Sequence, residues 1–320
     1  MKIFPLLIAL LGCACSTPPA SVRLVTFQGA EAPLIAQKQG LFTQAGLRVD
    51  LQETAGTAKA MEALLGGSAD SIVGTYEQAL QLQAKGQRVV AYRLLTECHC
   101  LALIVPPRKN IAKIADLAGK TVGVGAPGGS MQNFVAYLLE QAGAAEASYV
   151  AIGVGASAFA AIEGGKVDAA VVLASTLTRV RERYPRIRVL AETFSEEGSR
   201  QAFGFSNYPS MALLSTAGWL DKNPETAQRL SASLGQAVTW IQQHGAEQTR
   251  EALGGHVDLA ALKLHLPRYS AKGEFSPGPA TFVRDQLVKA RRIPAGAVPQ
   301  VESTYTNAFV GAFVKRKSSP

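Results

Sequence analysis

Apolar positions along the chain follow two spacings, one typical of strands and one typical of helices. Residues 22–27 alternate and are rich in β-formers, a break with Gly and Pro follows at 29–33, and apolar residues return at helical spacing over 34–45. The same order recurs along the chain. We expect strands at 22–27, 49–53, 71–73, 88–95, 98–105, 121–124, 149–152, 169–173, 189–192 and 210–215. Repeated strand–helix units predict an α/β fold built on parallel sheets.

Two stretches of the chain match each other at a nearly constant offset. Gln-Ala-Gly at 44–46 recurs at 141–143, and Gly-Gly-x-x-Asp at 66–70 recurs at 164–168, which are offsets of 97 and 98. Each Gly-Gly is expected at a helix C-terminus that needs a positive φ, and each Asp is expected where the chain turns into the next strand. The repeat predicts two similar lobes, each built from one βαβαβ unit.

The strand-like runs around Pro106-Pro107 and around 189–215 predict two crossings between the lobes. Beyond Asp221 the pattern becomes helical, and Pro224 follows Asn223 as expected at the first position of a helix. The predicted organisation is a signal peptide at 1–12, a tether at 13–21, lobe 1 formed by 22–103 and 206–260, lobe 2 formed by 104–205, and C-terminal helices at 261–320 that pack on lobe 1.

The N-terminus has the layout of a bacterial lipoprotein signal. Lys2 precedes the apolar run Ile3–Leu11, and Gly12 stands directly before Cys13. We expect cleavage before Cys13, whose thiol becomes the acylated membrane anchor, in the periplasm or on the outer face of the cytoplasmic membrane. Cys15 is a competing acceptor. An ordinary signal peptide and a transmembrane anchor are the alternatives.

Composition and charge narrow the function. With 48% hydrophobic residues in 320, the chain can bury a large core, which excludes disorder. From Arg250 onward, eleven basic and five acidic residues supply +6 of the net +8, so the excess lies mostly in the tail and does not argue for nucleic acid. No nucleophile elbow, Walker loop, metalloprotease helix or nucleotide fingerprint occurs. A binding protein without a cofactor is therefore expected, not an enzyme.

Cys98-His99-Cys100 is the most unusual local motif. On the expected strand, cysteines two apart have unfavourable disulfide geometry, so we expect them to pack as small hydrophobic residues. The other three histidines show no zinc spacing, and no metal site is expected; metal or redox chemistry at this motif is the alternative.

Ligands of parallel sheets bind beyond the carboxyl ends of the strands. That rule nominates six strand-to-helix loops, at 28–31, 56–57, 75–76, 128–130, 155–157 and 174–176. They offer hydroxyl groups and backbone N–H groups, which suit a small polar or anionic solute, and Glu31 is a candidate partner for a ligand amine. The candidate ligand-binding residues are Gln28, Glu31, Gly56, Thr57, Thr75, Tyr76, Gly128, Gly129, Ser130, Ser157 and Ser175.

An ordered series of segments resembles the periplasmic solute-binding proteins for nitrate, alkanesulfonates, taurine and thiamine pyrimidine precursors. The segments are 34–42, 46–50, 66–70, 84–86 and 114–122. The resemblance implies a type II periplasmic-binding fold whose two lobes close on a solute and deliver it to the permease and ATPase of an ABC importer. Residues 174–177 are small and polar, whereas many sulfonate binders carry a Trp-containing segment there.

Two other functions share this fold class. A ligand-sensing module for a membrane signalling partner would use the same site. An enzyme similar to the thiamine-pyrimidine synthase would need a cysteine-rich iron motif, and the Cys-His-Cys at 98–100 is shorter than that motif.

Overall fold

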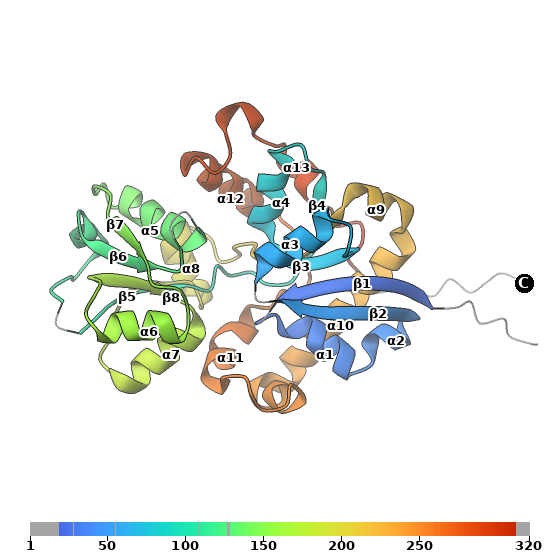
Figure 1. Cartoon of the computed structure of the whole chain (residues 1–320), viewed down its shortest axis with the longest axis horizontal. Helices are drawn as coiled ribbons and strands as arrows, with labels where there is room; N and C mark the ends of the chain where they lie inside the picture. The colour runs from blue at the N-terminus through green and yellow to red at the C-terminus, as the bar shows by residue number, and fades with distance from the viewer. Residues whose placement is uncertain (1–18, 28, 55, 108, 127–128, 312–320) are drawn as a thin grey trace, which may run out of the picture.

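A computed structural model describes residues 19–27, 29–54, 56–107, 109–126 and 129–311. Two five-stranded sheets lie side by side, each covered by helices (Figure 1). The first has the order β2-β1-β3-β10-β4 and the second the order β7-β6-β8-β5-β9. The strands are β1 (Ala20–Phe27), β2 (Leu47–Thr54), β3 (Ser71–Thr75), β4 (Val89–Leu94), β5 (Ala102–Val105), β6 (Thr121–Val124), β7 (Ser148–Ala151), β8 (Ala169–Val172), β9 (Arg188–Glu192) and β10 (Met211–Thr216).

One strand in each sheet runs against the other four. β10 is antiparallel to β3 and β4, and β5 is antiparallel to β8 and β9. Each of these two is the first strand of its sheet after the chain crosses from the other sheet. The prediction of parallel sheets is therefore wrong for β5 and β10, because a chain that enters from the other lobe runs back through the new sheet.

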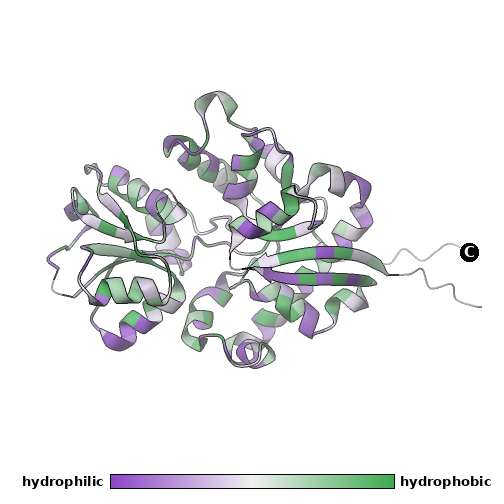
Figure 2. Ribbon diagram, viewed as in Figure 1, coloured by the Kyte–Doolittle hydropathy of each residue, from purple (hydrophilic) through white to green (hydrophobic). Residues whose placement is uncertain are grey.

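The helices that follow the strands begin close to the predicted loops. They are α1 (Glu31–Lys38), α2 (Leu41–Gln44), α3 (Thr57–Leu65), α4 (Tyr76–Gln83), α5 (Ser130–Gln141), α6 (Ala156–Glu163), α7 (Ala174–Arg183), α8 (Glu196–Phe203), α9 (Ala217–Lys222), α10 (Pro224–Ala252), α11 (Leu259–His265), α12 (Pro277–Lys289) and α13 (Val301–Thr304). Short 3-10 turns occur at Ile114–Leu117, Leu266–Arg268 and Ala295–Ala297. Figure 2 shows green apolar and purple polar residues alternating along strands and helices, as expected for elements that bury one face.

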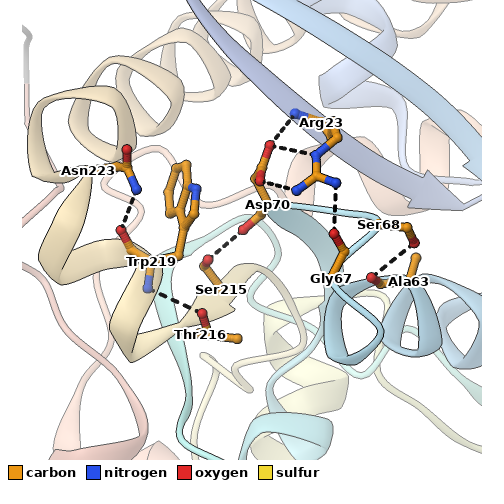
Figure 3. Close-up of polar contacts among 9 residues, drawn as sticks. All are labelled: Arg23, Ala63, Gly67, Ser68, Asp70, Ser215, Thr216, Trp219 and Asn223. Atoms are coloured by element: carbon orange, nitrogen blue, oxygen red, sulfur yellow. Dashed lines mark hydrogen bonds and ion pairs between the residues drawn. The ribbon is translucent and has the colours of Figure 1, made fainter.

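The predicted internal repeat is present in the backbone. The two sheets have the same strand order when β1, β2 and β3 are matched to β6, β7 and β8. The second glycine of each Gly-Gly pair has a left-handed φ, +74° at Gly67 and +65° at Gly165. Asp70 binds Arg23 at the start of β3 (Figure 3), and Asp168 binds Thr121 at the equivalent place. Both lobes are therefore built on one local plan.

The C-terminal helices contact both lobes, which extends the prediction that they pack on lobe 1. α11 packs against α10 and against α7 of the second lobe, and α12 packs against α4 and α5. Ala261 of α11 belongs to a core cluster made otherwise of second-lobe residues. Within the described part of the chain, no helix has the length and apolar character needed to cross a membrane.

Candidate functional site

The strand directions decide which edges of the two sheets face each other. β5 begins just after the first crossing and runs away from lobe 1, so the antiparallel β8 runs toward lobe 1. β10 likewise begins after the return crossing and runs away from lobe 2, so β3 runs toward lobe 2. The carboxyl ends of the parallel strands in both sheets therefore point at the other lobe (Figure 1). We call these two edges the facing edges.

In the first lobe, the described loops bring helix N-termini to the facing edge. Gly56 is the N-cap of α3, and Thr57 is its first residue; both are half-buried. The carbonyl of Gly56 accepts a hydrogen bond from Thr54 Oγ1 at 3.1 Å, which fixes the turn out of β2. Thr75 is the N-cap of α4, and its backbone N–H donates to Gln78 Oε1 at 3.0 Å.

In the second lobe, three more helices begin at the facing edge. Gly129 is the N-cap of α5 and Ser130 its first residue, both half-buried. Ser157, in the first turn of α6, is exposed and donates its hydroxyl to the Val154 carbonyl at 3.0 Å. Ser175, the second residue of α7, is exposed. These residues therefore lie at helix N-termini on the facing edge of the second lobe.

Glu31 is engaged inside the protein. Its side chain is only 4% exposed, it accepts a hydrogen bond from the Tyr269 hydroxyl at 2.8 Å, and its Oε1 lies 3.2 Å from His265 Nε2. Burial opposes protonation of His265, but the hydrogen bond and the negative charge of Glu31 together raise the pKa of the imidazole above its usual value. In this structure the carboxylate predicted to meet a ligand amine already has the His265 imidazole and the Tyr269 hydroxyl as internal partners.

Tyr76 is a core residue in this structure. Its ring is fully buried, its hydroxyl lies 2.6 Å from Thr304 Oγ1, and its ring centroid is 5.1 Å from that of Phe275. Its backbone N–H donates to the Ser210 carbonyl at 2.8 Å. The side chain therefore packs α13 against α4 and does not reach the facing edge. Gln28, Gly128 and Cys13 lie outside the described residues.

Two buried hydroxyls near the facing edges have no hydrogen-bond partner among the described residues. Thr26 Oγ1 lies near the end of β1, and Thr176 Oγ1 lies in the first turn of α7. Buried hydroxyls usually find partners, so these two are candidates for contact with a solute or a water molecule. Thr176 lies in one of the loops predicted at this edge but is not among the candidate residues, and Thr26 has no sequence signal beyond its position in a strand.

The Cys98-His99-Cys100 prediction is wrong. The segment precedes β5 and is not a strand, and Cys98 and Cys100 form a disulfide with their Cα atoms 5.0 Å apart. Cys100 has φ of +56°, and this left-handed residue turns the chain so that the two side chains meet. The motif therefore closes a tight loop at the first crossing between the lobes.

His99 joins the two crossings. Its ring stacks on Tyr208, which lies in the return crossing, with centroids 4.6 Å apart, and Phe134 of α5 meets it edge-on at 5.6 Å. Burial lowers the pKa of His99 to about 4, so the ring is neutral at neutral pH although Glu77 Oε1 lies 3.7 Å from Nε2. The Tyr208 hydroxyl donates to that same Glu77 oxygen at 2.8 Å. Aromatic packing, with no histidine ion pair, holds the crossings together.

A third segment, at 266–273, is bound along the crossings. Arg268 is 5% exposed, and its Nη2 donates to the carbonyls of Glu97 in the first crossing, at 2.5 Å, and of Ser206 in the second. The Glu97 N–H donates back to the Arg268 carbonyl at 2.9 Å, and Ser270 Oγ donates to Glu97 Oε1 at 2.6 Å. Among the described residues, no three His, Cys, Asp or Glu side chains group as a metal site requires. The 266–273 segment therefore ties the two crossings to each other.

Comparison with known proteins identifies the family. The sequence profile described as NMT1/THI5 like matches residues 31–248. The chain belongs to the NMT1/THI5-like family. This NMT1/THI5-like chain is 24% identical over 313 residues to YtlA of Bacillus subtilis (strain 168), which is named as a binding protein; the match covers 92% of this chain and 89% of YtlA.

Solved structures share its fold. A structure from Bordetella bronchiseptica RB50 is 29% identical with a TM-score of 0.74, and the match covers 91% of this chain and 96% of that one. The periplasmic aliphatic sulphonate binding protein SsuA from Escherichia coli is 19% identical with a TM-score of 0.72, covering 91% and 99%. The periplasmic nitrate-binding protein NrtA from Synechocystis PCC 6803 is 14% identical with a TM-score of 0.66, covering 91% and 87%. The NMT1/THI5-like chain thus has the two-lobed periplasmic-binding-protein fold.

Proposed function

We propose that this protein is a lipid-anchored extracytoplasmic solute receptor that captures a small polar or anionic solute between its lobes and delivers it to an ABC importer. The observation that carries the proposal is the direction of the strands. Strands of both sheets end at the facing edges, and helices begin there, which brings unpaired helix N–H groups from two lobes toward one space.

The charges at these helix ends favour an anion. α3, α5, α6 and α7 carry no acidic residue in their first turns, so their positive N-terminal dipoles are not neutralised by their own side chains. Glu31, the acidic residue of the first turn of α1, is already paired with His265. An anionic or zwitterionic solute whose acidic group meets the helix N-termini suits this distribution of charge.

The two crossings between the lobes are suited to act as a hinge, about which the lobes close on a solute. Two crossings join the lobes, and domain closure about such crossings buries a solute and changes the outer shape that a permease meets. We assign lobe 1 to 22–101 with 206–260 and lobe 2 to 102–205; the predicted boundary at 103 moves back by two residues because β5 belongs wholly to the second sheet. We assign the anchor to Cys13 after cleavage of residues 1–12. One protein of this fold is named as the ligand-binding component of an ABC-type import system and another as a periplasmic binding protein, which supports transport and a non-enzymatic role.

A thermal-shift panel tests the proposal on the purified protein. The panel contains nitrate, bicarbonate, taurine, alkanesulfonates, phthalate-like acids and pyrimidines. A solute present at 100 times its Kd should stabilise the fold by about 2.7 kcal/mol, and Ser130→Trp should abolish that shift. The matched control is Ser148→Trp, on the exposed start of β7 at the other end of the same sheet. No shift with any member, or equal shifts in both variants, contradicts the proposal.

The anchor has its own test. Labelling with radioactive palmitate in a bacterial host should be lost in Cys13→Ala and retained in Cys15→Ala. Label that survives in Cys13→Ala would place the anchor on another residue, and absence of label from the unsubstituted protein would contradict the anchor.

A further inference from the structure

One cavity of the second lobe lies away from the facing edge. It has a volume of about 470 Å³, and its walls include Val105 at the end of β5 and Arg188 at the start of β9. β5 runs away from lobe 1, so its end marks the far pole of lobe 2, which is the left-hand end of the molecule in Figure 1. The cavity is therefore separate from the proposed solute site.

Four cationic side chains line this cavity, namely Lys109, Arg183, Arg186 and Arg188. Lys109 pairs with Asp168 at 2.9 Å, and Arg183 pairs with Glu163 at 3.3 Å. Within the described chain, Arg186 forms no ion pair with a carboxylate. Arg188 Nη1 donates to the Ile111 carbonyl, and the charge of Arg188 also interacts with the Asp116 carboxylate. The cavity consequently has an excess of positive charge that an anion would balance.

The rest of the wall is apolar and stiff. Pro106, Pro107 and Pro185 contribute rigid backbone, and the Tyr184 ring and Ile187 contribute apolar surface. The guanidinium of Arg183 lies 5.7 Å from the centre of the Tyr184 ring. A cavity in this size range with charged donors on apolar walls matches the usual composition of a small-molecule site.

We propose that this cavity, which we call the far-pole site, binds a small organic anion with an oxyanion group and an apolar body. The Arg186 guanidinium holds the oxyanion, because its planar fork matches the geometry of a carboxylate, sulfonate or phosphate. The apolar body lies against the proline-lined wall. Under the proposed function the anchor leads into β1, which begins at the opposite end of the molecule in Figure 1, and this favours a dissolved ligand over a lipid headgroup.

Helix α7 links the two sites. It begins at Ala174 on the facing edge and ends at Arg183 in the cavity wall, and its ten residues span about 15 Å. Both sites can therefore be occupied at once. The far-pole site and the solute site are formed by different residues at opposite ends of α7.

Isothermal titration calorimetry with three probes on the full chain tests the proposal. Benzoate carries both an oxyanion and an apolar body, acetate carries the charge alone, and benzyl alcohol carries the ring alone. We expect benzoate to bind at one site at least tenfold more tightly than either partial probe. Equal affinity for acetate and benzoate, or no heat with benzoate, overturns the proposal.

Variants locate the binding. The double substitution Arg183→Gln with Arg186→Gln should raise the benzoate Kd at least tenfold. Arg181→Gln is the matched control, because Arg181 lies on α7 two residues from Arg183, on another face of the helix and outside this cavity. Ser130→Trp should leave benzoate binding unchanged; loss in Ser130→Trp, or full retention in the double variant, assigns benzoate to the solute site or elsewhere and overturns the proposal. A separate failure of the solute panel would leave this result untouched.

Discussion

The Asp70 carboxylate is bound by Arg23 from three nitrogen atoms, with Oδ2 2.8 Å from the backbone N and 3.1 Å from Nε, and Oδ1 2.5 Å from Nη2 (Figure 3). The Asp70 N–H returns a hydrogen bond to the Arg23 carbonyl at 2.9 Å. This ring fixes the start of β3 beside β1. Arg23 Nη1 also donates to the Gly67 carbonyl at 2.7 Å, so one side chain joins the strand, the turn and the end of α3.

The second lobe repeats the ring at the predicted offset of 98. Asp168 Oδ2 accepts from the Thr121 N–H at 3.0 Å, and the Asp168 N–H donates to the Thr121 carbonyl at 2.8 Å. The cation is supplied differently, by Lys109 at 2.9 Å from a segment outside the repeat. The backbone half of the ring is therefore shared by both lobes, and the side-chain half is particular to each.

Removing the Asp70 carboxylate should destabilise the first lobe. In Asp70→Ala the Arg23 N–H loses its acceptor, and because the group is part-exposed we expect a loss of about 1–2 kcal/mol in the free energy of unfolding. Urea unfolding at neutral pH measures it. The control is Asp221→Ala, an exposed carboxylate on α9, which should change stability by less than about 0.5 kcal/mol. Equal effects of the two substitutions would contradict a stabilising role of the Asp70 carboxylate.

The same ring predicts a response to acid. Burial opposes ionisation of Asp70, but its hydrogen bonds with Arg23 and the charge of Arg23 lower the pKa of the carboxyl below its ordinary 3.8. A lowered folded-state pKa gives stability that is present above pH 3.8 and lost as pH falls through the folded value. The stability difference between the protein and Asp70→Ala should therefore shrink below pH 4, and a constant difference down to pH 2 would disprove the contribution.

His265 should give a pH dependence of stability opposite to that of Asp70. Its pKa is raised above 6.5 in the folded state, so its stabilisation is complete below about pH 6.5 and is lost as pH rises through the folded value. His265→Phe should lower the free energy of unfolding by about 1–3 kcal/mol at pH 6 and by less at pH 9. Melting temperatures at both pH values measure the change. His256→Phe, at an exposed site, is the matched control and should show no such pH-dependent difference.

How far the sequence predicts this molecule depends on whether a feature is local. The repeated Gly-Gly-x-x-Asp and the alternating runs are local. They correctly indicated two lobes and the approximate strand positions, except that the strand expected at 98–105 begins only at Ala102. Strand direction is not encoded in alternation, so the reversal of β5 and β10 could not be obtained from the pattern alone. The contact of Glu31 with Tyr269, separated by 238 positions, likewise has no sequence signal.

The sequence also could not tell which residues of a predicted loop point toward the facing edge, because neighbouring residues of a helix point in different directions. Thr75 and Tyr76 are neighbours in one loop, yet a helix turns by about 100° per residue, and this directs the Tyr76 ring into the core. The Cys98–Cys100 pairing depends on a left-handed residue that strand spacing does not anticipate. The cationic cavity could have been noticed in the sequence, because five arginines fall within 179–188. A net charge summed over the whole second lobe does not reveal this cluster.

His99 predicts sensitivity to mild acid at the crossings. Because burial lowers its pKa to about 4, the folded protein resists protonation between pH 6.5 and 4, whereas the unfolded chain accepts the proton. This difference corresponds to about 3 kcal/mol of stability lost by pH 4. His99→Phe keeps the stacking on Tyr208 and should remove that loss, measured by urea unfolding at pH 7 and pH 4.5. His256→Phe should retain it, and identical pH profiles for the protein and His99→Phe would refute the role of His99.

Arg268 should control how firmly the two crossings are held. In Arg268→Leu the Ser206 carbonyl loses a charged donor and the Glu97 carbonyl loses one of two donors, since the Tyr208 N–H still reaches it at 3.1 Å. We expect a loss of about 1.5–3 kcal/mol in stability. Hydrogen exchange should accelerate first at the N–H groups of Tyr208 and Ser210, which bind the first crossing, before it accelerates in β1 or β6. Arg200→Leu, exposed on α8, is the control. Uniform acceleration across both sheets would mean that Arg268 supports global stability without acting on the hinge.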